Sequence, residues 1–325
     1  MGTELDVATL AISLALTVYL LITHVLHYWK SVKSTGSSGR STTNLHRRRR
    51  KNHPVEFALI LTFIILDIVY FLLKYRAHVS ASHVFNIHCS TITAAYLSVM
   101  ATSIWTVELF FLVRGWRILR EMSSNAKLLD IDENALMIYD VMCRIGIVFV
   151  VLCSVITVVL VTLFVEYEEV DGLCVPTGKY KQQITMSAFS LMACAVSTGV
   201  MALFAFAKPL VQYQTALIQR SKSYATDEDE AGSEVIQRND TVRLSLKRTL
   251  IRVCVCLCAV HVMFLISGVF HVLVNEPEAW GYGSRKIYRS LYCGCSVLMI
   301  VSMEMTYQNW RQRLFPFTAF CGRKT

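Results

Sequence analysis

The sequence predicts an all-α membrane protein, a seven-transmembrane helix bundle followed by a short C-terminal amphipathic helix. Hydrophobic residues make up 54% of the 325-residue chain and charged residues only 17%, whereas soluble domains carry about 25% charged residues. The mean hydropathy is +0.47. Seven apolar stretches approach the roughly 20 residues that a helix needs to cross the hydrocarbon core. Basic residues gather in alternate segments between them.

The seven stretches follow one another along the chain. The first lacks a basic residue before its apolar run and ends in "HYWK", so it does not have the form of a cleaved signal peptide. The seventh is the least apolar, because Arg289 and Glu304 lie inside it. The predicted spans are residues 7–28, 55–75, 89–113, 145–165, 184–207, 253–274 and 287–307.

Basic residues indicate the orientation of the spans. Of the 32 lysines and arginines, 25 fall on one side: eight in residues 30–51, four in 114–127, eight in 208–252, four after Tyr307, and Arg144. Positive charge marks the cytoplasmic side of a membrane protein. We therefore expect a multi-pass protein of the plasma membrane, with the N-terminus outside and the C-terminus in the cytoplasm. The net charge of +9 is accounted for by these loops and predicts no nucleic-acid partner.

Two cytoplasmic segments have a distinct composition. Residues 213–245 are poor in apolar side chains and contain "DEDE" between basic ends, which predicts a mobile loop. In the tail, residues 308–325, Trp310, Leu314 and Phe317 recur at i, i+4 and i+7 beside two arginines. This spacing predicts a short helix on the inner lipid leaflet. Cys321 near its end is a candidate for palmitoylation.

Charged side chains inside the spans are the candidate functional residues. Such groups are costly in lipid and usually face the bundle interior with a partner. Glu108 and Arg114 are six residues apart, which is about 9 Å along a helix and about 240° around it, so each needs a partner elsewhere. We expect Asp67, Glu108 and Glu304 to form a polar network in the inner half of the bundle, with Arg114 as its cytoplasmic neighbour.

The cysteines have two interpretations. Cys89 opens the third span and Cys174 lies in the second outer loop, so both face an oxidising compartment, where a disulfide can persist. The alternative is that Cys89 is a buried small apolar residue. Cysteines two residues apart in "RVCVCLC" and "CGC" point about 200° away from each other on a helix. One helix cannot present both to one ion, so we expect no metal site.

These features together resemble the G-protein-coupled receptors. Seven spans, an outside N-terminus and a cysteine at the head of the third span with another in the second outer loop are typical of that family. Arg114 follows Cys89 by 25 residues, the separation that rhodopsin-like receptors have between this cysteine and the arginine that closes the third span. The neighbours differ, because Val113 replaces the family's acid and Gly115 its aromatic residue.

Other marks of the family are partial. Asp67 takes the place of the acid in the middle of the second span, and Tyr307 that of the tyrosine that closes the seventh, although the Asn-Pro before it reads "ME". The family's asparagine of the first span, tryptophan of the fourth and Trp-x-Pro of the sixth are missing. The chain is thus similar to divergent or chemosensory serpentine receptors.

The resemblance implies a receptor that binds an extracellular ligand of unknown chemistry and activates a cytoplasmic heterotrimeric G protein, with Arg114 as the switch. No nucleophile–base pair, phosphate-binding glycine loop or metal-ligand helix motif is found in the sequence, so we expect neither an enzyme nor a cofactor. Two alternatives stay open. Arg114 only reaches the phosphates of the inner leaflet, or the chain is a transporter or channel with the three carboxylates on its path.

Overall fold

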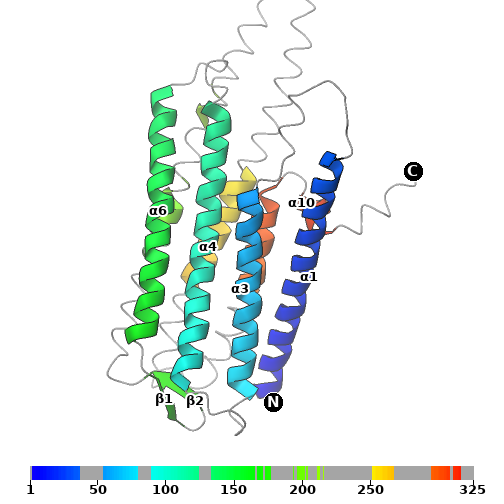
Figure 1. The fold of residues 1–325 in the computed structure, drawn as a ribbon, viewed down its shortest axis with the longest axis vertical. Helices are drawn as coiled ribbons and strands as arrows, with labels where there is room; N and C mark the ends of the chain where they lie inside the picture. The colour runs from blue at the N-terminus through cyan, green and yellow to red at the C-terminus, as the bar shows by residue number, and fades with distance from the viewer. Residues whose placement is uncertain are drawn as a thin grey trace, which may run out of the picture.

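Four long apolar helices stand side by side in the computed structural model of the chain (Figure 1). They are α1 (Gly2–Gly36), α3 (Pro54–Val79), α4 (Cys89–Ser123) and α6 (Glu133–Phe164). Each contains an apolar window long enough to cross a membrane, which confirms the first four predicted spans and indicates a multi-pass membrane protein. These windows are Ala8–Lys30, Pro54–Leu73, Leu97–Arg117 and Met137–Leu160.

The structure describes these four helices and several shorter segments. Two of those segments are apolar helices, Ile251–Ile266 and Gly294–Met305. The predicted fifth span is described only in helical pieces, and residues 213–245 only at residue 215. Cys321 lies outside the described residues. In full, the described residues are 2–36, 54–79, 89–123, 133–164, 167–170, 173–176, 193, 196–201, 203, 211–212, 215, 251–266, 294–307 and 310–315.

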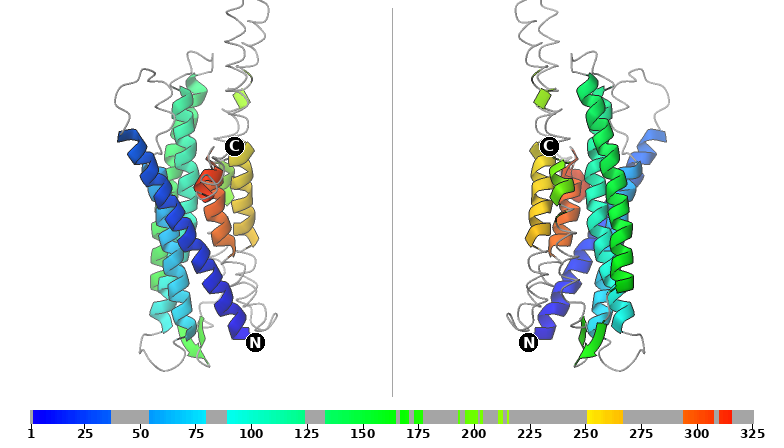
Figure 2. Two further views of the ribbon diagram at one scale, coloured as in Figure 1. Left: turned by 90° about the vertical axis from the view of Figure 1, so that its right-hand side faces the viewer. Right: turned by 90° about the vertical axis from the view of Figure 1, so that its left-hand side faces the viewer.

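The helices form two layers. α3, α4 and α6 stand in a row that α1 crosses at a slant, and the segments Ile251–Ile266 and Gly294–Met305 lie on one side of that row (Figure 2). α4 occupies the centre, because 56% of its apolar window is buried against 22–39% for the other three helices. Its Phe110 and Phe111 pack in the same core as Leu257 and Met303.

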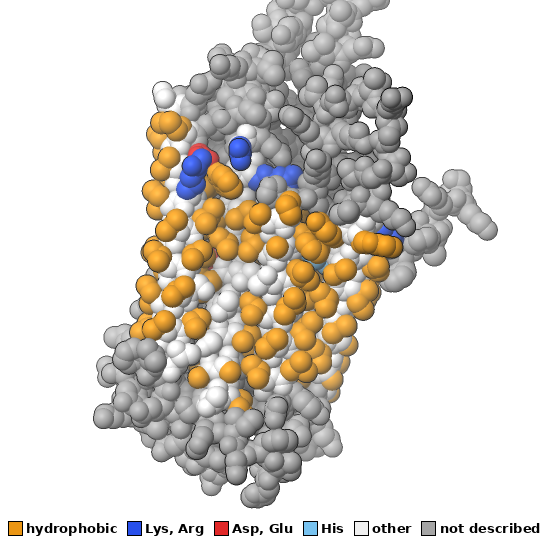
Figure 3. All heavy atoms as spheres, viewed as in Figure 1, with side chains coloured by type: hydrophobic (Ala, Val, Ile, Leu, Met, Phe, Trp, Pro, Cys, Tyr) orange, Lys and Arg blue, Asp and Glu red, His pale blue; other side chains and the backbone are white. Residues whose placement is uncertain are grey.

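α6 faces outward. Its side chains Ile145, Val148 and Ile156 are each more than half exposed, and apolar side chains cover most of the described surface in Figure 3. In water such a face would be unfavourable, since burial of apolar area is what drives folding there. Lipid is therefore the solvent that fits this surface.

α4 and α6 are longer than their predicted spans. α6 begins at Glu133 rather than at residue 145, and the added turns carry Asp140, which is partly buried, and Arg144, which is exposed. Those two side chains are one turn apart and form an ion pair at 2.8 Å. Hydropathy predicts that the span begins after Arg144, because it counts the two charges separately. In the helix they are one turn apart and neutralise each other.

A small hairpin closes one end of the bundle. β1 (Tyr167–Val170) and β2 (Leu173–Pro176) pair antiparallel, with Glu169 opposite Cys174. The hairpin contacts α4 and lies at the same end as the N-terminus (Figure 1). We call this the hairpin end and the opposite one the arginine end.

A short helix follows Gly294–Met305, as the sequence predicts. This helix, α10 (Trp310–Leu314), packs against α1, where the Tyr19 hydroxyl donates to the Leu314 carbonyl at 2.9 Å. The predicted amphipathic face is only partly right. Leu314 is buried and Arg311 exposed, but Arg313 is buried in the bundle with 4% exposure.

Candidate functional site

Glu56 organises the arginine end of the bundle. It lies in the first turn of α3 and is fully buried. One carboxylate oxygen accepts hydrogen bonds from Arg114 Nη1 at 2.6 Å and from the Tyr307 hydroxyl at 2.9 Å, and the other accepts one from Arg117 Nη1 at 3.2 Å. A buried carboxylate is stable only when it is paired and hydrogen-bonded in this way, and its place in the first turn also suits the helix dipole.

Arg114 joins three parts of the chain. Besides Glu56 of α3, its Nη2 donates to the Thr306 carbonyl at 3.4 Å, and its Cζ lies 4.2 Å from the centre of the Tyr307 ring. A guanidinium at that distance from an aromatic face is attracted to it. Arg114, on α4, thus ties α4 to α3 and to the segment that ends at Tyr307.

A second buried carboxylate, Glu304, lies nearby. Arg313 Nε donates to one oxygen, and Arg313 Nη2 lies 3.3 Å from the other, which also contacts His24 Nδ1. Burial alone would lower the pKa of Arg313, but the neighbouring Glu304 carboxylate raises it, so the guanidinium keeps its charge. This pair holds α10 against the bundle.

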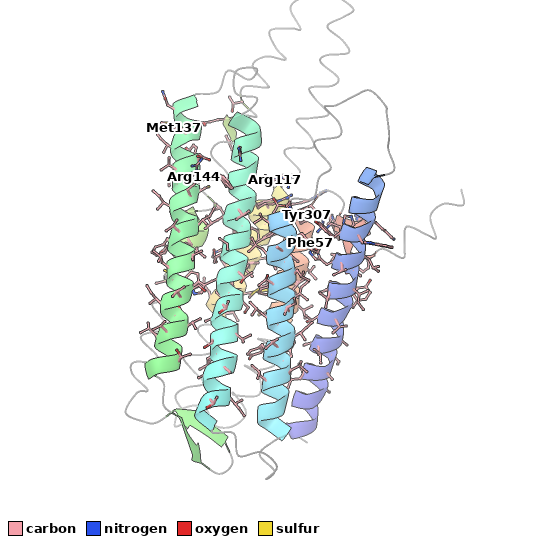
Figure 4. All side chains as sticks on the ribbon, viewed as in Figure 1. Phe57, Arg117, Met137, Arg144 and Tyr307 are labelled. Atoms are coloured by element: carbon pink, nitrogen blue, oxygen red, sulfur yellow. The ribbon has the colours of Figure 1, made fainter. Side chains whose placement is uncertain are left out.

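Tyr307 connects the two carboxylates. Its ring lies between the guanidinium groups of Arg114, at 4.2 Å, and Arg313, at 3.8 Å. Figure 4 shows Tyr307, Arg117 and Phe57 at the same end of the bundle, with Phe57 stacked on His24 at 4.6 Å between ring centres. We call the seven side chains the arginine–carboxylate cluster: His24, Glu56, Arg114, Arg117, Glu304, Tyr307 and Arg313.

The other two predicted acids lie elsewhere. Asp67 is fully buried and accepts a hydrogen bond from Ser296 Oγ at 3.1 Å. Glu108 is also fully buried, and His261 Nε2 lies 3.0 Å from its Oε1. That separation is an ion-pair distance, so His261 is the described partner of the Glu108 carboxylate.

The predicted residues thus separate into groups. Arg114 and Tyr307 are together, and Glu304 joins them through Arg313 and Tyr307. No hydrogen bond between described residues joins Asp67, Glu108 and Glu304 to one another. Approximate depths along the predicted spans could be expected from the sequence, but not the direction in which each side chain faces around its helix axis.

Sequence reasoning missed Glu56, the partner that Arg114 has in the structure. Glu56 comes two residues after Pro54, at the edge of the predicted second span, where an acid passes as an interfacial residue. The sequence did hold a signal. Glu56 is followed directly by a long apolar run, and an acid inside such a run usually faces the bundle interior with a partner.

Gly199 lies against the His261 imidazole. A Cβ built at Gly199 would be 1.7 Å from His261 Nε2, and that nitrogen is the one that faces Glu108. We therefore expect Gly199→Ala to push His261 away from Glu108 and to lower the free energy of unfolding by about 1–3 kcal/mol through overpacking. Thermal unfolding in detergent measures this loss.

Gly294 provides the matched control for that substitution. It is also a helical glycine, but a Cβ built there meets no atom within 4 Å, so Gly294→Ala should leave the melting temperature unchanged. Adding His261→Ala to Gly199→Ala should restore part of the loss, because the clash disappears. Equal melting temperatures for the Gly199 and Gly294 variants would contradict the predicted contact.

Five described cysteine side chains on the helices are free thiols: Cys143, Cys254, Cys256, Cys258 and Cys295. The predicted pair is described only by its backbone: Cys89 is the first residue of α4 and Cys174 lies on β2, and the two elements are in contact. Within the described residues, no three His, Cys, Asp or Glu side chains are grouped as a metal site would require.

No family model matches the chain, and no curated protein is significantly similar to it.

Proposed function

We propose that the chain is a seven-transmembrane receptor that binds an extracellular ligand and activates a cytoplasmic heterotrimeric G protein. The observation that carries the proposal is the contact of Arg114 with Glu56 and Tyr307. One buried guanidinium there links three helical segments at one end of the bundle. An arginine with a partner on a neighbouring helix has two positions available, paired and released, which is what a signalling switch requires.

The arginine end is the cytoplasmic end in this proposal, and the hairpin end is outside. The excess of basic residues in alternate connecting segments supports this orientation. The common position of the N-terminus and the hairpin at one end agrees with it (Figure 1). Residues 184–207, 253–274 and 287–307 then supply the fifth, sixth and seventh spans.

A disulfide between Cys89 and Cys174 would tether the hairpin to the outer end of α4. The contact of β2 with α4 supports the pairing, and such a bond persists only in an oxidising compartment. We therefore expect mass spectrometry without reduction, on protein from the cell surface, to detect a peptide that links the two residues. Free thiols at both positions would contradict the pairing and remove its support for an outside hairpin.

In the proposed mechanism, a ligand at the hairpin end shifts the position of α4 and weakens the hold of Glu56 on Arg114. Separating a buried ion pair costs about 3–5 kcal/mol when nothing replaces the lost partner, so the paired state dominates without ligand. A ligand shifts this equilibrium only by its difference in affinity for the two states. The G protein adds to the shift if it contacts the released Arg114.

A transporter or channel is the second candidate. It is favoured by Glu108, a fully buried carboxylate that faces His261 Nε2 at 3.0 Å, because intramembrane acids often mark ion or proton paths.

One experiment on Glu108→Gln separates the two candidates. Cells that express the chain are screened with candidate ligands, and G-protein activation and membrane current are recorded in parallel. A receptor should give a ligand-dependent G-protein response, with altered basal activity in Glu108→Gln. A substrate-dependent current that Glu108→Gln abolishes, with no G-protein response, would contradict the receptor. Asp67→Asn is the matched control, since it also removes a buried acid.

A further inference from the structure

Two arginines and one tryptophan lie together where α4 meets α6 at the arginine end. Trp116 Nε1 donates to Asp140 Oδ1 at 2.6 Å, and Arg144 Nη2 lies 2.8 Å from Asp140 Oδ2. The guanidinium groups of Arg120 and Arg144 each lie 5.9 Å from the centre of the Trp116 ring. Both arginines are thus ordered around one indole and belong to different helices.

The group is exposed and carries net positive charge. The side chain of Arg144 is 65% exposed, and Arg120 is exposed as well. Asp140 has both oxygens occupied, so two arginines and one aspartate leave one net positive charge at this place. Guanidinium groups present several N–H donors in a planar fork, a geometry that matches phosphate oxygens.

The position of the group is that of a membrane boundary. Trp116 is the next-to-last residue of the α4 window, and Arg144 is seven residues inside the α6 window, which begins at Met137. Seven residues are about 10 Å of helix, a depth from which a long arginine side chain extends toward the head groups. Figure 3 shows the basic side chains at the top of the apolar surface of the described helices, and Figure 4 places Arg144 and Met137 on α6.

An apolar strip continues along α6 from Arg144. Val148, Val151 and Val155 follow at i+4, i+7 and i+11, and they are 59%, 47% and 56% exposed. Residues at this spacing share one face of a helix. The surface therefore combines two guanidinium groups beside one indole with a track on which an acyl chain can lie.

We infer that Arg120 and Arg144 bind the phosphate of an anionic phospholipid, whose acyl chain lies along Val148, Val151 and Val155. Asp140 orients Arg144 and Trp116, and it also limits the affinity because its own charge opposes the phosphate. The site is separate from the arginine–carboxylate cluster and does not depend on the proposed receptor function.

Native mass spectrometry of the full chain in detergent tests this site. The lipid probes are phosphatidic acid and phosphatidylcholine with the same acyl chains. Glycerol phosphate, which has the phosphate but no acyl chain, is the soluble competitor. Arg120→Gln and Arg144→Gln should each weaken the binding of phosphatidic acid about fivefold, the usual effect of one arginine near an anionic lipid. Phosphatidylcholine should bind more weakly than phosphatidic acid.

Two further variants keep the test independent of folding. Arg311→Gln is the matched control, since Arg311 is exposed and lies 5.4 Å from the Trp310 ring, and it should leave binding unchanged. Asp140→Asn should strengthen binding, because it raises the charge of the site while it keeps an acceptor for Trp116. Weakening by Asp140→Asn, equal weakening by Arg311→Gln, or displacement of the lipid by an equal concentration of glycerol phosphate would overturn the inference.

Discussion

Replacing Glu304 by glutamine is expected to lower the free energy of unfolding by about 3–5 kcal/mol, since it removes the carboxylate that pairs with a buried arginine. Arg313 is 4% exposed and has Glu304 as its carboxylate partner in the described structure. The same substitution removes the charge that faces His24. Thermal unfolding in detergent, followed by a thiol-reactive dye on the buried Cys143 and Cys256, should show a fall of about 5–10 °C.

Two variants separate the loss of the ion pair from a general effect of removing a buried acid. Asp67→Asn changes an acid that is equally buried but has one described donor, Ser296, so its effect should be much smaller. Arg313→Met added to Glu304→Gln should recover part of the loss, because the buried positive charge is then gone. A Glu304→Gln protein as stable as Asp67→Asn would show that the α10 ion pair contributes nothing.

Replacing Glu56 by glutamine is expected to raise ligand-independent G-protein activation. Glu56 accepts hydrogen bonds from Arg114, Arg117 and Tyr307, and a glutamine keeps one acceptor but removes the charge that holds the guanidinium groups. The population in which Arg114 is released should grow. Coupling free energies of about 1–3 kcal/mol are typical of such equilibria, which corresponds to a change of about 5- to 150-fold in basal signalling.

Arg117→Gln is the matched control for Glu56→Gln. Arg117 contacts the same carboxylate at 3.2 Å, but through the other oxygen, and its side chain is 20% exposed, against 11% for Arg114. Its removal leaves the Arg114 pair in place, so basal signalling should change much less. If both variants were equally active, the release of Arg114 would not be the cause.

The long helices could be predicted from the sequence because each one carries its own signal. Twenty or more apolar residues in a row specify a helix in lipid whatever its neighbours are, so α1, α3, α4 and α6 were found. The start of α6 was missed because hydropathy counts Asp140 and Arg144 as two separate charges, although they pair with each other in the structure. The β1–β2 hairpin was read only as a loop, since four-residue strands carry a weak periodic signal.

The partners of the polar residues could not be predicted in the same way. The sequence places Glu56, Asp67, Glu108 and Glu304 at approximate depths, but pairing depends on how each helix is turned and on which helices are neighbours. Arg313 illustrates the limit. It was read as a charged residue on an exposed helix face, and the structure buries it against Glu304, because α10 packs against α1 rather than lying free.

The central claim is that Arg114 transmits the signal once Glu56 no longer holds it. The direct test of the proposed receptor function is the rate of ligand-independent nucleotide exchange on a heterotrimeric G protein by purified protein carrying Glu56→Gln, with and without Arg114→Ala, at equal amounts of folded protein. Loss of the Glu56→Gln gain when Arg114→Ala is added is the result that this account predicts. A double variant as active as Glu56→Gln alone would contradict it, because coupling would then proceed without the arginine.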